Sequence, residues 1–152
     1  MKHIIKSFDT YVVHELRWLE VPLAKFAIFV IYFWFGLLKL LGVSPAGPLV
    51  ETLFQKTLEG FIAFPVFYMA FALFEMVIGI LFLVPKLERV AILLIAFHLV
   101  MIVLPLFLLP HITWQSFLAP TLEGQYIIKN ILIAAAAVVV GSKLTPFGKK
   151  QH

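Results

Sequence analysis

The chain of 152 residues is 62% hydrophobic and only 13% charged, with a mean hydropathy of +1.05. A soluble domain keeps roughly a quarter of its residues charged, so this composition excludes a soluble protein and predicts a single integral membrane domain. The net charge of +4 includes no basic run with interleaved aromatic residues that would indicate nucleic acid, and the absence of cysteine excludes disulfide, thiol-redox, zinc-thiolate and iron–sulfur chemistry.

Residues 1–21 predict an amphipathic helix that lies on the cytoplasmic membrane surface. Trp18 would sit near the lipid headgroups. The charged residues of this segment also exclude the apolar core of a cleaved signal peptide. Its apolar residues share one helical face, which comprises Ile4, Ile5, Phe8, Val12, Leu16 and Leu19.

Residues 22–142 predict an all-α, four-helix membrane bundle. A bilayer core needs roughly 20 helical residues, and continuous apolar runs indicate helices rather than strands. Pro22 suits the first turn of the first span, Pro85 should end the second, and Pro105 should kink the third. The four runs of spanning length are residues 22–41, 61–84, 90–109 and 125–142.

The connections are short and partly ordered. Residues 86–89 alone join the second and third spans, so these spans should form a tight antiparallel hairpin. Residues 48–59 predict a short external amphipathic helix that begins at Pro48 and ends at Gly60. Trp114, in the last external loop, is a candidate interface anchor.

Basic residues predict the orientation, because cytoplasmic segments of membrane proteins carry an excess of lysine and arginine. With the N-terminus inside, nine basic residues fall on the cytoplasmic side and only Lys39, Lys56 and Lys129 on the other. We therefore expect a multi-pass protein of the cell (inner) membrane with both termini in the cytoplasm. Residues 143–152 would form a cytoplasmic tail.

Ionisable residues inside the spans are the candidates for function, because each costs at least ~2.5 kcal/mol at the bilayer centre unless it is paired or faces water. Glu75 in the second span and His98 in the third are nearly symmetric about the connecting loop, so both should lie at one depth. Adjacent antiparallel helices would bring the carboxylate and the imidazole into contact, and we expect them to handle protons. The alternative is that these polar groups only fix helix packing.

Three spans carry seams of small and polar residues that should face inward. We expect Tyr32 to share a midplane layer with Glu75 and His98, and Lys39 and Asn130 to lie above it on the external side. The candidate ligand-binding residues are Tyr32, Gly36, Lys39, Lys129 and Asn130, and no metal-ligand spacing appears. The seams themselves are Tyr32, Gly36 and Lys39; Tyr68, Ala72, Glu75 and Gly79; and Tyr126, Asn130, Ile133, Ala137 and Gly141.

Three stretches resemble the DoxX-like membrane protein family, particularly its YkgB-like branch. They are residues 34–39 (WFGLLK), 74–80 (FEMVIGI) and 123–130 (EGQYIIKN), whose order and spacing match over most of residues 22–142. The resemblance implies a four-helix membrane protein with inner glycine, lysine and glutamate positions. It also implies an association with membrane redox or oxidative-stress systems. The positions carried over are Gly36, Lys39, Glu75, Lys129 and Asn130.

Three functions remain open for this chain. The first is a quinone- or redox-linked subunit or accessory factor of a membrane oxidoreductase or oxidative-stress system, in which Glu75 and His98 exchange protons with a quinone. The second is a small proton-coupled transporter, a homo-oligomer that uses Glu75. The third is an assembly or scaffold protein whose polar seam binds the helices of a partner. The bilayer and redox-complex subunits are the expected partners, with quinone as the candidate cofactor.

Overall fold

The computed structural model describes residues 2–146, with side chains from residue 5 onward. The end of the expected tail, including Lys149 and Lys150, lies outside these residues. By length and composition, four helical stretches in this part of the chain can cross a membrane: Ile5–Leu40, Phe64–Leu83, Glu88–Leu108 and Leu122–Ser142. The membrane class and the four spans predicted from the sequence are therefore supported.

The first helix is much longer than predicted. Helix α1 runs without a break from Lys2 to Leu40, and Pro22 lies inside it. The prediction that a separate helix ends near residue 21 and that Pro22 occupies a first turn is wrong. Proline removes one backbone hydrogen bond and strains the preceding turn, at about 3 kcal/mol, but here the helix continues on both sides. The residues before Pro22 are more polar than those after it, yet both parts belong to one continuous helix.

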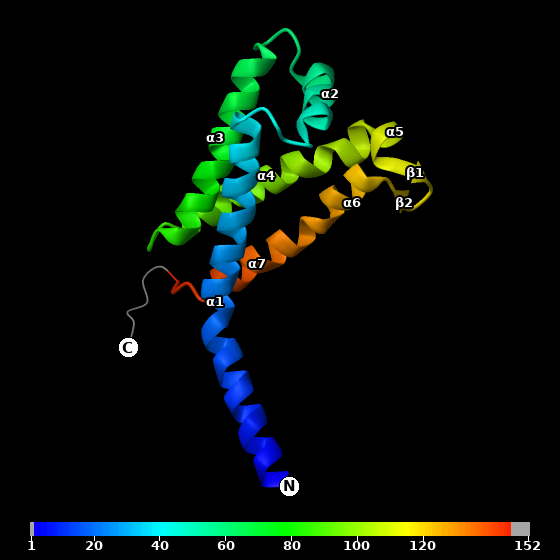
Figure 1. The fold of residues 1–152 in the computed structure, drawn as a ribbon. Helices are drawn as coiled ribbons and strands as arrows, with labels where there is room; N and C mark the ends of the chain where they lie inside the picture. The colour runs from blue at the N-terminus through cyan, green and yellow to red at the C-terminus, as the bar shows by residue number, and fades with distance from the viewer. Residues whose placement is uncertain (1, 147–152) are drawn as a thin grey trace.

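Four long helical segments pack pairwise (Figure 1). Helix α1 lies along α3 (Phe64–Leu83) and contacts α7 (Ile131–Ser142), while α4 (Glu88–Leu108) contacts α3 and α7. Residues 84–87 join α3 to α4, which confirms the tight hairpin and the end of the second span before Pro85. The core between these helices consists of Ile28, Tyr32, Ile78, Phe82, Ala91, Ile95, Ile133, Ala137 and Val140.

Ion pairs tie the helices together at the hairpin end of the bundle. Lys25 on α1 contacts Glu88 at the start of α4 with its Nζ 2.6 Å from Oε1. Glu20 on α1 also pairs with Lys143, which directly follows α7. The part of α1 before Glu20 therefore projects beyond the bundle, as Figure 1 shows. Its large apolar side chains are exposed, among them Phe8, Leu16 and Trp18.

Shorter elements cover the opposite end of the bundle. Helix α2 (Gly47–Thr57) overlaps the short helix predicted at residues 48–59 and begins one residue earlier. The short helix α5 (Pro110–Thr113) leads into a two-stranded antiparallel sheet of β1 (Trp114–Ser116) and β2 (Ala119–Pro120), which an all-α prediction did not include. The Trp114 indole donates a hydrogen bond to the Leu106 carbonyl. The fourth span consists of α6 (Leu122–Lys129) and α7, which meet at Asn130.

Candidate functional site

Two glycines bring α1 and α3 into close contact and set the frame of the site. A Cβ atom on Gly36 would lie 2.7 Å from Met76 Cγ and 2.8 Å from the Ala72 carbonyl oxygen. A Cβ on Gly79 would lie 3.1 Å from the Phe33 backbone nitrogen. Small residues at a helix crossing allow backbones to approach in this way. The crossing places the inner faces of α1 and α3 directly against each other.

Lys39 on α1 and Glu75 on α3 form a buried ion pair at this crossing. Lys39 Nζ lies 2.6 Å from Glu75 Oε2, and the two residues are each only 6% exposed. Lysine near a helix end commonly extends to the headgroups, but this one turns inward. Removing two charges from water is unfavourable unless their geometry and remaining hydrogen bonds compensate. The short contact and the surrounding polar groups supply that compensation.

His98 on α4 extends this pair into a chain of four side chains. Its Nε2 lies 3.3 Å from Glu75 Oε1, which confirms the contact predicted from the hairpin, and its Nδ1 lies 3.0 Å from the Tyr32 hydroxyl. The Nε2 contact is close enough for an ion pair but does not meet hydrogen-bond geometry, so this atom has no hydrogen-bond partner among the described residues. If Tyr32 donates to Nδ1, the neutral ring carries its proton on Nε2, facing the carboxylate.

Aromatic rings surround His98 and Lys39. The Phe71 ring centroid lies 5.2 Å from that of His98 and 5.6 Å from Lys39 Nζ. Phe74 and Tyr32 also contact the imidazole, with ring centroids 5.8 and 5.2 Å away. A cation at this distance from an aromatic face is stabilised by the ring quadrupole. The Phe71 ring therefore stabilises the charge on Lys39, and the three rings pack around the buried imidazole of His98.

The resulting chain runs from Tyr32 through His98 and Glu75 to Lys39. Neighbouring members lie 2.6 to 3.3 Å apart. Each of the four can gain or lose a proton or a hydrogen bond, and each is held by a different turn of α1, α3 or α4. Glu75 contacts both Lys39 and His98, so its carboxylate links the two. The arrangement therefore gathers groups that can donate or accept a proton, in contact with one another inside an apolar bundle.

The structure separates the other predicted site residues from this chain. Lys129 is exposed and lies over the Tyr126 ring, 5.4 Å from its centroid. Asn130 donates hydrogen bonds to the Tyr126 and Ile127 carbonyls of its own helix. Tyr126 itself is 68% exposed, so the predicted inward seam on the fourth span is wrong at this position. Gly36 acts by close packing, and Phe71 was not predicted as a neighbour of the site.

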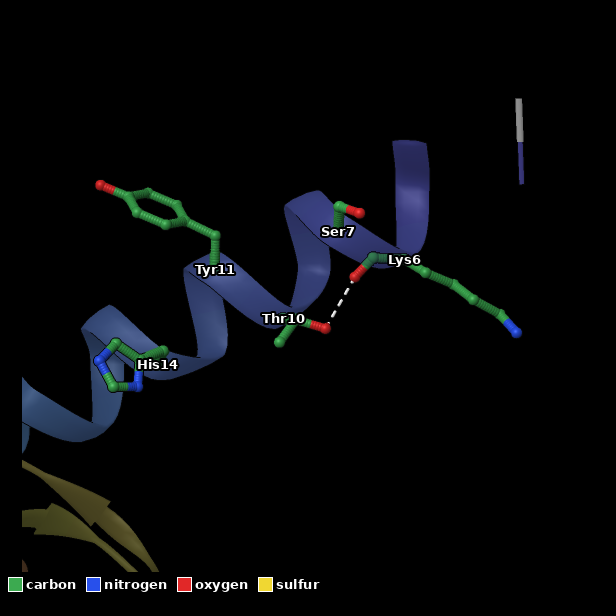
Figure 2. Close-up of a pocket in the computed structure, with 5 residues that line it drawn as sticks. All are labelled: Lys6, Ser7, Thr10, Tyr11 and His14. Carbon is green, nitrogen blue, oxygen red and sulfur yellow. Dashed lines mark hydrogen bonds between the residues drawn. The ribbon is translucent and has the colours of Figure 1, made fainter. Parts of the chain in front are cut away.

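Two hollows on the described surface lie away from this cluster and hold no comparable set of polar side chains. One lies on the projecting part of α1, where Figure 2 shows Lys6, Ser7, Thr10, Tyr11 and His14 with a single hydrogen bond, from the Thr10 hydroxyl to the Lys6 carbonyl. The other is an apolar groove between α4 and α7 that is lined by several alanines. Among the side chains described, those of residues 5–146, no three from His, Cys, Asp or Glu gather as a metal site would require.

Comparisons with protein families, curated proteins and solved structures find no match to this chain.

Proposed function

We propose that this protein is a quinone-linked component of a membrane redox system, acting as a subunit or accessory factor. The observation that carries the proposal is the buried chain of Tyr32, His98, Glu75 and Lys39, which joins three helices in an otherwise apolar bundle. Intramembrane ionisable groups that are paired with one another mark proton or ligand pathways. The resemblance to the DoxX-like family points to the same class of function.

The four buried side chains match the chemical requirements of a quinone. Its reduction takes up electrons and protons in equal number, and the headgroup has two carbonyl oxygens that accept hydrogen bonds. The electrons come from a redox partner in the membrane complex. The protons need exchangeable groups at the depth of the ring, and His98 and Glu75 supply them. Lys39 is the donor suited to a carbonyl oxygen that gains negative charge.

The pairing of Glu75 distinguishes this proposal from a small cation exporter. An exporter needs a carboxylate that a substrate cation can reach, whereas Glu75 Oε2 already contacts Lys39 at 2.6 Å. A cationic substrate would have to displace that amine. A neutral ligand that accepts a hydrogen bond from Lys39 leaves the ion pair in place.

We also propose that the protein lies in the inner membrane with both termini on the cytoplasmic side. The Glu20–Lys143 contact puts the entry of α1 into the bundle and the exit of α7 at the same end. The basic residues at this end, including Lys86 and Arg89, match the usual cytoplasmic excess. The chain contains no cysteine, so Lys86→Cys gives one reactive thiol. A membrane-impermeant maleimide should label it only after the cells are opened. Labelling of intact cells would show that the protein has the opposite orientation.

The test of function is quinone binding by the purified protein in lipid nanodiscs. Short-tailed ubiquinone and menaquinone analogues should bind saturably to the wild-type protein. Glu75→Gln should weaken that binding roughly tenfold to a hundredfold, since a charge-assisted hydrogen bond contributes about 1.5–3 kcal/mol. Glu88→Gln is the matched control, because Glu88 also pairs with a lysine at 2.6 Å but lies at the end of the bundle.

Two results would overturn the proposal. One is the absence of saturable binding of either quinone to wild-type protein. The other is equal affinity in the wild type and Glu75→Gln while both keep native helicity and elute as single species. A loss of binding in Glu88→Gln equal to that in Glu75→Gln would show that the effect does not belong to the buried chain.

A further inference from the structure

Helix α2 is joined to the bundle by two glycines in the left-handed region of backbone space. Gly42, after α1, has φ +71°, and Gly60, before α3, has φ +89°. Nothing lies within 4 Å of the position of a Cβ on either residue. Glycine adopts such angles at little cost, and the open space around both leaves room for the backbone to rotate once the hydrogen bonds of Gly42 and Val43 to the Lys39 and Leu38 carbonyls break. Residues 43–59, which we name the α2 segment, therefore have a hinge at each end.

Several contacts hold the α2 segment between the start of α3 and the end of α4, where Figure 1 shows it. The Phe54 ring is 5% exposed and lies against Phe64 and Phe67, with centroids 5.3 and 5.0 Å away. Lys56 Nζ donates to the Leu108 carbonyl at 2.7 Å. Phe54 is the one fully buried side chain of α2. A side-chain hydrogen bond also joins Ser44 of the segment to Tyr68 of α3, and all of these contacts must break for the segment to lift.

The Phe54 ring is the outermost member of an aromatic row that ends at the buried chain. Phe67 lies against Phe54 and stacks on Phe71, with centroids 5.8 Å apart and planes 11° apart. Phe71 in turn contacts His98 at 5.2 Å and Lys39 at 5.6 Å. These spacings fall within the range of stacked and tilted aromatic pairs. A flat ring that replaced Phe54 would continue the same row.

We propose that the α2 segment is a lid and that Phe54 is a plug in the entrance for the quinone headgroup. This inference rests on the proposed function, because it names the route to the same buried chain. When the segment lifts on its glycine hinges, the Phe54 ring leaves the aromatic row. The quinone ring first stacks on Phe67 in its place and then passes along Phe71 to reach Lys39 and His98, with the apolar tail in lipid.

If Phe54 is a plug, removing its ring should improve quinone binding. In Phe54→Ala, the closed lid no longer competes with the ligand, so quinone affinity should rise about tenfold if the open form makes up roughly a tenth of the wild-type population. Gln55→Ala, at the exposed neighbouring position of the same helix, should leave affinity unchanged. Unchanged or weaker binding in Phe54→Ala, in protein that elutes as a single helical species, would overturn the plug.

A second measurement needs no quinone and separates the lid from the ligand. The chain has no cysteine, so Phe71→Cys gives a single thiol behind the lid for labelling by a water-soluble maleimide. Adding Phe54→Ala should speed labelling about tenfold, and adding Gln55→Ala should not. An unchanged rate with Phe54→Ala would overturn the lid whatever the quinone result. Faster labelling without binding of any quinone would support the lid and overturn the proposed function.

Locking the lid gives the converse result. In Lys56→Cys/Leu108→Cys, a short bis-maleimide joins the positions that the Lys56 hydrogen bond links in the structure. Joining them should abolish quinone binding, whereas the same double variant capped with a single-ended maleimide should bind as the wild type does. Full binding in the joined protein would show that the headgroup does not enter under α2.

Discussion

The buried pair of Lys39 and Glu75 makes a quantitative prediction about stability. Removing one member leaves the other as an unpaired charge in an apolar interior, which costs about 3–5 kcal/mol. Glu75→Gln and Lys39→Met should therefore each lower the free energy of unfolding by about that amount. The double variant leaves no charge behind, so its loss should be smaller than the sum by at least about 2 kcal/mol.

The assay is reversible unfolding in mixed micelles, with rising dodecyl sulfate and helicity followed by circular dichroism. The control is the same cycle on Lys25 and Glu88, whose side chains are 23% and 12% exposed at the end of the bundle. Water is within reach there, so their coupling should be about 0–1 kcal/mol. Losses for Lys39 and Glu75 that add within about 0.5 kcal/mol would refute the buried pair.

The other predictions use the same unfolding assay. Gly36→Ala should destabilise the protein by about 1–3 kcal/mol, because its Cβ would lie 2.7 Å from Met76 Cγ. Gly79→Ala, whose Cβ would make contacts of 3.1 to 3.3 Å, should lose less stability. The reverse order of the two losses would contradict the observed crossing of α1 and α3. Tyr32→Phe should lose about 1–3 kcal/mol, because it leaves the buried Nδ1 of His98 without its partner; unchanged stability would show that this hydrogen bond does not form.

The positions of the spans and one key contact could be predicted from the sequence. Long apolar runs mark spans because the backbone must be hydrogen-bonded internally in lipid, so the last three spans appear close to their predicted bounds and the first ends close to its predicted end. The contact of Glu75 with His98 follows from symmetry, because both residues are similar distances from one short loop. Depth along a tight hairpin depends only on the helical rise. Neither prediction needs knowledge of how the helices cross.

The other features of the site depend on how the helices cross and on the direction of each side chain, and residue spacing specifies neither. Lys39 lies seven residues beyond Tyr32, about 10 Å along α1, and the sequence placed it above the layer. The close crossing at Gly36 and the long lysine side chain bring its amine down to Glu75. Tyr126 shares a spacing with inward residues but turns outward next to the helix break at Asn130. The sequence did not reveal that α1 continues through Pro22. The polarity of a segment indicates which solvent it suits, and it does not indicate where a helix ends.

The most direct test of the quinone site is the ¹⁵N resonance of the His98 side chain in nanodiscs that contain histidine-labelled protein. Saturation with a short-tailed quinone should shift the His98 ring nitrogens and leave those of His14 and His111, which are exposed on α1 and α5, in place. The shift should vanish in Glu75→Gln and persist in Glu88→Gln. His98 resonances that do not move at saturating quinone would contradict the central claim that the buried chain meets the headgroup.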